Sequence, residues 1–202
     1  MKLLVIRHGQ SEADVLNVHE GRADFPLTSL GLRQAAAAAE YISRHYTLSR
    51  IYSSTLTRAR QTAEQISAAC GVPVTAEDML MEFNNGLIAG LDRETAAKRY
   101  PRPERLPIHD AVHGQESALE FRFRADVMLS RLLSENDPDA VVAVVSHGGM
   151  ITQLYRSFLR LPADSDIWFA TGDTGIHEWM VSDDRRLVVR ANFTAHTDGL
   201  GE

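Results

Sequence analysis

The residues of this chain that are best suited to chemistry are two histidines and two arginines in three short polar segments. These segments are Arg7-His8-Gly9, Ser53 to Arg58, and Ser146-His147-Gly148. Arginine carries a permanent charge on a forked set of donors that fits phosphate oxygens. Gly9 and Gly148 leave space where a strand turns into a helix, and free backbone N–H groups at such turns favour anions. Together the three segments predict a pocket for a phosphate group.

Each polar segment belongs to, or follows, a short run that is typical of a strand. These runs are Leu3 to Ile6, Ile51 to Ser54, and Ala140 to Val145, and the first and last indicate buried parallel strands. In a parallel sheet, ligands bind at the carboxyl ends of the strands. We therefore expect the three polar segments to meet at one edge of the sheet.

Helical patterns alternate with these strands, and a hairpin pattern follows them. Apolar spacing predicts helices that contain Leu32, Ala35, Ala39, Ile42 and Tyr46; Ala59, Ala63, Ile66 and Cys70; Leu119, Phe123, Val127, Met128 and Leu132; and Met150, Leu154 and Phe158. Residues 176–193 alternate like a hairpin. This order predicts a three-layer α/β/α sandwich, with a mostly parallel, mixed central sheet and helices on both faces. We expect residues 1–202 to form a single domain with a substrate-facing insertion around 83–116.

Composition and charge exclude several classes of protein. The 202-residue chain has a net charge of −6, so no general basic surface for nucleic acid is expected. No apolar run approaches the roughly 18 residues that a membrane span needs, and the apolar start is too short for a signal peptide. Cys70 is the only cysteine, so no internal disulfide can form. We expect a cytoplasmic protein without a nucleic-acid or membrane partner; a homo-oligomer is an open possibility.

Five sequence blocks, in order, resemble the histidine phosphatase superfamily, which includes phosphoglycerate mutase. The blocks are Leu4–Ser11, Gly21–Thr28 with Gly31 and Gln34-Ala35 after it, Ser53–Ala63, Leu80–Glu82 followed by Gly86 and Gly90, and Val145–Gly149. They span residues 3 to about 150. The tripeptide Arg-His-Gly alone would be a weak signal, whereas five blocks in the family's order are a specific one.

The resemblance implies a role for each matching residue. His8 attacks phosphorus and becomes phosphohistidine, while Arg7, Arg58 and His147 bind the phosphoryl oxygens. Glu82 protonates the leaving oxygen and then activates the water that cleaves phosphohistidine. These roles agree with physical chemistry, because the two arginines oppose a third positive charge and should keep His8 neutral. The same charges would stabilise the transferring phosphoryl group.

Further contacts to substrate are expected from Ser11, Arg22 and Gly148, although helix capping is an equal alternative for Ser11.

Two positions depart from the family pattern. Gln10 stands where Glu is common, and Asp14 stands where Asn often helps to hold phosphate. Because a carboxylate would repel phosphate, we expect Asp14 to point toward an arginine or to face a helix N-terminus.

The sequence therefore predicts a metal-independent phosphomonoester hydrolase that acts on a small phosphorylated metabolite through a phosphohistidine intermediate. No cofactor is expected, because the histidines have no metal-ligand spacing and the arginines supply the charge that a metal would bring. A cofactor-dependent phosphotransferase of the phosphoglycerate mutase type is the alternative. The modest stretch between Glu82 and His147 favours water as the acceptor. A non-catalytic phospholigand-binding module is a third hypothesis, which the presence of both His8 and Glu82 disfavours.

Other histidines carry weaker signals. His109 and His113 lie between the expected acid and the long helix, where substrate recognition could vary, and substrate contact by either is left open. His177 lies in an alternating strand pattern, which makes a packed or surface histidine the expected outcome.

Overall fold

The computed structural model describes residues 1–201 and contains a six-stranded sheet. Its strands are β1 (Lys2–Arg7), β2 (Arg50–Ser53), β3 (Val74–Ala76), β4 (Val141–Ser146), β5 (Ile176–Val181) and β6 (Arg186–Phe193). They lie in the order β3-β2-β4-β1-β5-β6. The first four of these pair in parallel, whereas β5 pairs with both of its neighbours in antiparallel fashion. The sheet is mostly parallel but mixed, as the sequence predicts.

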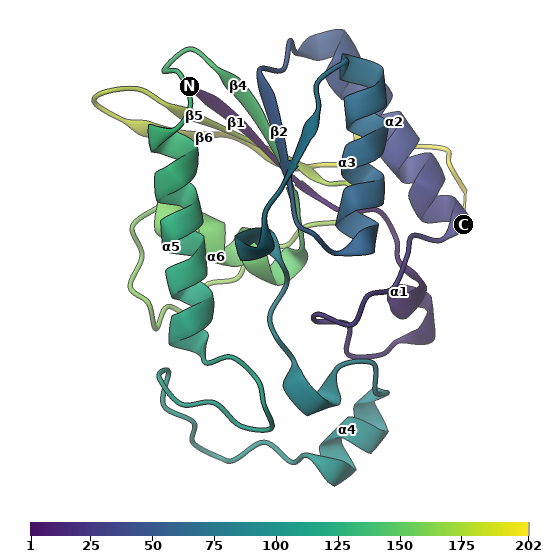
Figure 1. Ribbon diagram of the computed structural model, residues 1–202, viewed down its shortest axis with the longest axis vertical. Helices are drawn as coiled ribbons and strands as arrows, with labels where there is room; N and C mark the ends of the chain where they lie inside the picture. Colours follow the sequence, from purple (N-terminus) through teal and green to yellow (C-terminus); the bar gives the residue numbers. More distant parts are fainter. Residues whose placement is uncertain (202) are drawn as a thin grey trace.

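Helices cover both faces of this sheet (Figure 1). They are α1 (Glu12–Leu16), α2 (Ser29–His45), α3 (Thr57–Cys70), α4 (Arg93–Arg99), α5 (Ala118–Ser134) and α6 (Gly148–Phe158), with 3₁₀ turns at Asp78–Leu80, Gly86–Ile88 and Ala195–Thr197. Helices α2 and α3 pack on one face, and α5 and α6 pack on the other. The expected three-layer α/β/α sandwich is thereby confirmed. Within residues 1–201, every helix is too short or too polar to cross a membrane.

Strand β1 is buried on both faces, which explains its uninterrupted apolar sequence. Leu3 and Val5 belong to the core under α5 and α6, whereas Leu4 and Ile6 belong to the core under α2 and α3. Alternate side chains of a strand point to opposite faces, so a central strand of a three-layer fold must be apolar at every position. Burial of each such side chain stabilises the fold by about 1.5–3 kcal/mol. Polar chemistry can begin only where the strand leaves the core, at Arg7.

The ends of the helices follow local sequence signals. The Thr28 hydroxyl accepts a hydrogen bond from the backbone N–H of the third residue of α2, and Asp92 caps α4 in the same way. Ser117 and Glu120 form a reciprocal capping box at the start of α5. Gly71 ends α3 with a φ of 70°, in the left-handed region that glycine adopts without strain. These caps fix where the loops around the strand ends begin.

The expected buried faces of two helices are partly wrong. Phe123 is 64% exposed, and Leu119 and Leu32 are each 41% exposed. Helix α5 instead buries the face that includes Phe121 and Ala125. Its sequence carries apolar residues on two faces, and spacing alone could not tell which one the sheet would cover. The unburied face of α5 consequently presents an aromatic side chain to solvent.

Strand register brings the three polar segments to one edge. Arg7 of β1 pairs with Ser146 of β4, and Ser53 of β2 pairs with Val145 of β4. The segment that contains the 3₁₀ turn Gly86–Ile88 and α4 lies beyond this edge, at the lower end of the view in Figure 1. The carboxyl ends of the parallel strands therefore face the segment expected to be the substrate-facing insertion.

Candidate functional site

The two histidines of the polar segments lie side by side beneath the strand ends. The ring centroids of His8 and His147 are 5.0 Å apart, and both side chains are buried. The Arg58 side chain is also fully buried, and its Nε donates a hydrogen bond to His8 Nε2 over 3.3 Å. The fold thus joins residues from β1, α3 and the start of α6 in one place.

The hydrogen bonds of His8 define its tautomer. Its Nδ1 lies 2.7 Å from the carbonyl oxygen of Gly9, which can only accept, so Nδ1 carries the proton. The electron pair is therefore on Nε2, which lies next to Arg58. Burial lowers the pKa of His8 well below its usual range, and the charges of Arg58 and Arg7 lower that pKa further. At neutral pH His8 is a neutral imidazole with a nucleophilic Nε2.

Backbone carbonyls hold the Arg58 guanidinium in place. Its Nη2 donates to the carbonyl of Gly21 over 2.8 Å, and its Nη1 donates to the carbonyl of Ala23 over 3.1 Å. Asp24, in the same loop, accepts hydrogen bonds from the backbone N–H and the hydroxyl of Thr57 at the start of α3. The loop and the helix therefore fix each other, and Arg58 is fixed between them.

Arg7 enters the site from the end of β1. Its Nη1 donates to the carbonyl of Thr171 over 3.0 Å, and its Nη2 lies within 3.4 Å of carboxylate oxygens of Asp14 and Asp173. Its Nε is buried and makes no hydrogen bond. A buried donor without a partner costs free energy, so this N–H is available to a bound anion. Asp14 points toward an arginine, as the sequence suggests.

His147 contacts Ser54 through Nε2, and this contact allows a tautomer with the ring proton on Nδ1. The Ser54 oxygen accepts from the backbone N–H of Leu56 over 3.3 Å and lies 2.8 Å from His147 Nε2. When the Ser54 hydroxyl donates a hydrogen bond to His147 Nε2, the ring proton of His147 is on Nδ1. This Nδ1 is buried and unpartnered, which makes it a second free donor. Burial and the charge of Arg58 hold the pKa of His147 well below its usual range.

Glu82 lies across the start of α6. Its carboxylate accepts hydrogen bonds from the backbone N–H of Phe83 over 2.7 Å and of Gly149 over 2.8 Å. Its own carbonyl accepts from Arg124 Nη2 over 3.2 Å and from Arg22 Nε over 3.5 Å. A Cβ atom at Gly149 would collide with the Glu82 carboxylate, so a larger residue at this position would displace that carboxylate.

Arg7, His8 and Glu82 line one cavity of about 310 Å³, whereas the fully buried Arg58 and His147 are not among its lining residues. Its lining residues are Arg7, His8, Glu20, Glu82, Gly148, Gly149, Thr152, Trp168, Phe169 and Thr171. Of the expected substrate contacts, Gly148 lies in this lining. The Ser11 hydroxyl is occupied by Asp14 in a capping box at the start of α1.

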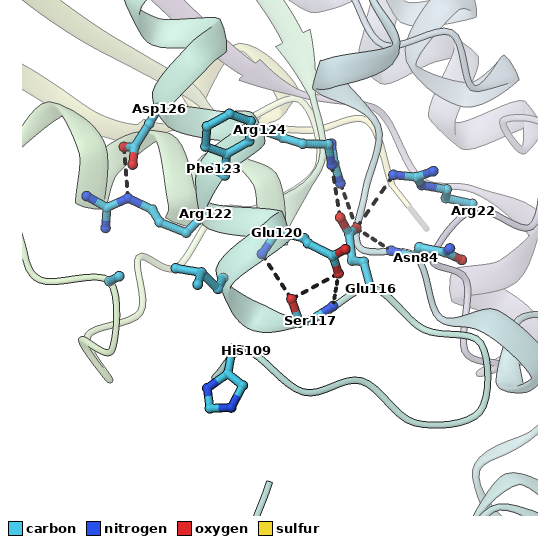
Figure 2. A pocket seen from close by; sticks show the side chains of 12 residues that line it. Arg22, Asn84, His109, Glu116, Ser117, Glu120, Arg122, Phe123, Arg124 and Asp126 are labelled. Atoms are coloured by element: carbon cyan, nitrogen blue, oxygen red, sulfur yellow. Dashed lines mark hydrogen bonds and ion pairs between the residues drawn. The ribbon is translucent and has the colours of Figure 1, made fainter. Parts of the chain in front are cut away.

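Arg22 lines a second, larger cavity of about 710 Å³. Figure 2 shows Arg22, Asn84 and Arg124 converging on the carboxylate of Glu116. His109 lines the same cavity, at its opposite side from Arg22. Because Arg22 and Arg124 also contact the Glu82 carbonyl, Glu82 lies between the two cavities.

Several residues of the site carry no recognisable sequence signal. Glu20 lies 3.8 Å from His8 Nε2, yet nothing in the pattern around it marks it as part of the site. Trp168, Phe169 and Thr171 come from the irregular segment before β5, which shows no motif. His177 is a packed histidine that is fully buried, one of the two outcomes expected for it.

A metal centre is not apparent in this arrangement. Within residues 1–201, no three or more His, Cys, Asp or Glu side chains are grouped so that they could hold a metal ion. The positive charge in the cavity comes instead from guanidinium groups and from the N-terminus of α6. This charge suits a phosphate group and its developing negative charge in a transfer reaction.

Comparisons with known proteins agree with this geometry. A family model described as histidine phosphatase superfamily (branch 1) matches residues 3–194. Glucosyl-3-phosphoglycerate phosphatase of Mycobacterium tuberculosis is 31% identical over 88% of this chain and 83% of that protein. Phosphoserine phosphatase 1 of Hydrogenobacter thermophilus is 29% identical over 100% of this chain and 95% of that protein. The structure of mycobacterial glucosyl-3-phosphoglycerate phosphatase with VO3 is 28% identical, with a TM-score of 0.82, over 95% of this chain and 98% of that one.

We expect Gly149→Ala to lower kcat for p-nitrophenyl phosphate by about 10²-fold, since a misplacement near 1 Å of a reacting group can cost this much. The added methyl group displaces the Glu82 carboxylate, with which it would collide. Gly148→Ala is the matched control, because its Cβ would meet only the Thr171 side chain, at 3.8 Å. A smaller loss is expected there. Equal losses in two folded variants would contradict the steric argument.

Proposed function

The chain belongs to the histidine phosphatase superfamily, and on that premise we propose that His8 is its nucleophile and Glu82 its proton donor. The family and the phosphatase activity, both expected from the sequence, are confirmed by the family match and by the relatives. The protein is a phosphomonoester hydrolase for small phosphorylated metabolites and works through a phosphohistidine intermediate.

The observation that carries the assignment of His8 is a neutral imidazole held beside two guanidinium groups. The Gly9 carbonyl binds the proton on Nδ1, which leaves the electron pair on Nε2, and this pair attacks phosphorus once Arg58 Nε turns its hydrogen bond from Nε2 to the phosphoryl group. The N–P bond forms as the ester P–O bond breaks. Arg58, the free Nε of Arg7 and the free Nδ1 of His147 offer donors for the phosphoryl oxygens. These donors are already in place, so little reorganisation is needed during transfer.

Glu82 is suited to proton transfer because it lines the same cavity as His8. In its protonated form it gives its proton to the ester oxygen that leaves. In its ionised form it then takes a proton from the water that attacks phosphohistidine, which releases phosphate and restores His8. The backbone N–H groups of Phe83 and Gly149 orient the carboxylate for both steps.

We also propose that the organic part of the substrate lies over the larger cavity and carries a carboxylate. Two relatives are named for phosphate esters with a carboxylate, glucosyl-3-phosphoglycerate and phosphoserine. In this chain, Arg22 lines that cavity beside Glu82 and is about one-third exposed (35%). Its guanidinium is therefore within reach of solvent and of a substrate anion. The segment 83–116 supplies His109 and Asn84 to the cavity, which supports its assignment as a substrate-facing insertion of a single domain.

We further propose that catalysis needs no metal or other cofactor, because Arg7 and Arg58 already provide the cationic charge. A cytoplasmic location, and the lack of a nucleic-acid or membrane partner, are proposed on the net charge of −6 and the single cysteine.

The central test is to trap the phosphoenzyme. Rapid quench with ³²P-labelled substrate, in the presence of a chelator, should yield an acid-labile, base-stable label on the wild-type protein. His8→Ala should carry no label and show no turnover, while circular dichroism shows an intact fold. Full activity of that variant would overturn the assignment. Transfer of the label to a phosphoglycerate instead of water would favour a mutase-type reaction.

The role of Glu82 can be tested with two leaving groups. In single-turnover phosphorylation, we expect Glu82→Gln to lose about 10²–10⁴-fold on an alkyl phosphate such as phosphoserine, because an alkoxide needs a proton to leave. The loss on p-nitrophenyl phosphate should be much smaller, since nitrophenolate leaves without one. Equal losses on both substrates would indicate that Glu82 only shapes the cavity.

The carboxylate-binding role of Arg22 predicts a change in KM. Arg22→Ala should raise KM for phosphoserine and phosphoglycerate by roughly ten- to a hundredfold, the equivalent of one hydrogen bond to a charged group. KM for p-nitrophenyl phosphate should change little. Arg33→Ala removes an exposed arginine of α2 and serves as the control. A similar rise in KM for both kinds of substrate would count against a carboxylate subsite.

A further inference from the structure

Glu20 places a carboxylate inside the cavity that is suited to the phosphoryl group. Its Oε1 lies 3.1 Å from Arg58 Nε, and its Oε2 lies 3.8 Å from His8 Nε2. The side chain is 17% exposed and lines the 310 Å³ cavity. Because Arg58 Nε directs its hydrogen bond to His8, Glu20 Oε1 is left buried without one. The Glu20 carboxylate, itself an anion, thus lies where the substrate phosphate must bind during the reaction.

The surroundings of Glu20 contain both signs of charge. The titratable, charged and hydrogen-bonding groups that face it are Arg58 from α3, Arg7 from the end of β1, His8 directly after β1, and Ser11 and Asp14 from the start of α1. Burial raises the pKa of Glu20, and Asp14 adds to this effect. Arg58, the Ser11 hydroxyl and Arg7 lower the pKa, but the net direction is upward. His8 is neutral and adds no charge.

We propose that Glu20 competes with phosphate for Arg58, so that a phosphate group binds fully only when Glu20 takes up a proton from water. The protonated carboxyl then donates a hydrogen bond to a phosphoryl oxygen instead of repelling it. This inference rests on the proposed function, because it places the phosphoryl group beside His8. Its consequence is that the product phosphate is held weakly whenever Glu20 is ionised.

The direction of the pH effect follows from this coupling. Below the pKa of Glu20 in the free enzyme, the carboxyl is already protonated and phosphate binds without a penalty. As the pH rises through that pKa, the proton must be taken up on binding, and affinity falls. Bound phosphate is itself negative, which raises the pKa of Glu20 further in the complex. Phosphate binding and proton uptake are therefore linked.

Calorimetric titration with inorganic phosphate tests the proposal without turnover. Binding is measured at several pH values in pairs of buffers with different ionisation enthalpies, for wild type, Glu20→Gln and Glu12→Gln. Glu12, exposed in α1, is the matched control for loss of one negative charge. Ionisation of phosphate itself is common to all three proteins, so differences between them report on the side chains.

We expect Glu20→Gln to bind phosphate about tenfold more tightly than wild type near pH 8, as one pKa unit of coupling requires. The difference should close as the pH falls below the pKa of Glu20 in the free enzyme, because Glu20 is then protonated in both the free and the bound state. Between the pKa values of Glu20 in the free and the phosphate-bound enzyme, wild type should also take up more protons than Glu20→Gln, by about half a proton per site for one pKa unit of coupling, whereas Glu12→Gln should match wild type.

Equal proton uptake in wild type and Glu20→Gln would overturn the proposal. So would weaker phosphate binding in Glu20→Gln, which would mean that Glu20 only positions Arg58. Glu20→Ala is measured in parallel, so that the result does not depend on one variant folding. If the phosphohistidine assignment itself were wrong, the wild-type protein would carry no label in the quench experiment. The differences in phosphate binding between wild type and Glu20→Gln would persist in that case.

Discussion

The structure of this site depends on keeping the Arg58 guanidinium buried and charged. A buried cation is tolerated only when its donors are satisfied and a counter-charge lies near. Here the carbonyls of Gly21 and Ala23 take two donors, and the Glu20 carboxylate lies 3.1 Å from Nε. Arg58 also lies in the first turn of α3, whose dipole already favours anions. The loop between α1 and α2, and the start of α3, are therefore shaped around one charge, which in turn keeps His8 neutral.

The second guanidinium reaches the site through a longer chain of contacts. Arg7 is held by the carbonyl of Thr171, and the Thr171 hydroxyl lies 2.9 Å from His177 Nε2. His177 Nδ1 accepts from the backbone N–H of Asn192, so its Nε2 carries the proton and donates to Thr171. Burial lowers the pKa of His177 to about 4, which keeps this arrangement uncharged at neutral pH. Through these contacts the β5–β6 hairpin, which forms one side of the sheet, supports the anion site at the carboxyl ends of the central strands.

The part of the site around Glu82 is built from other elements than the part around His8. This separation allows substrate preference to vary. Ser146 donates to the carbonyl of Leu80 over 2.7 Å, which ties the segment before Glu82 to β4. Gly149 then holds the carboxylate at the start of α6. On the other side of Glu82, the cluster around Glu116 comes from α5 and from the segments that precede α2 and follow Glu82. Arg22 belongs to both parts of the site, because its neighbours Gly21 and Ala23 hold Arg58, whereas Asn84, Glu116 and Arg124 belong to segments that carry neither His8 nor Arg58.

The sequence by itself determined the layered fold, the edge where chemistry occurs, and the grouping of Arg7, His8, Arg58 and His147, because short apolar runs and the polar segments after them encode these features. The place of Glu82 in the site came from the resemblance to the histidine phosphatase superfamily. Asp14 could likewise be expected to face an arginine, from charge alone. Only the tertiary structure decided that α5 buries Phe121 and not Phe123, that Arg22 lines a second cavity, and that Glu20 faces the nucleophile. Each of these depends on which surfaces of distant segments meet. Glu20 has no local pattern to mark it, and its contact with Arg58 exists only because the loop after α1 folds over the start of α3.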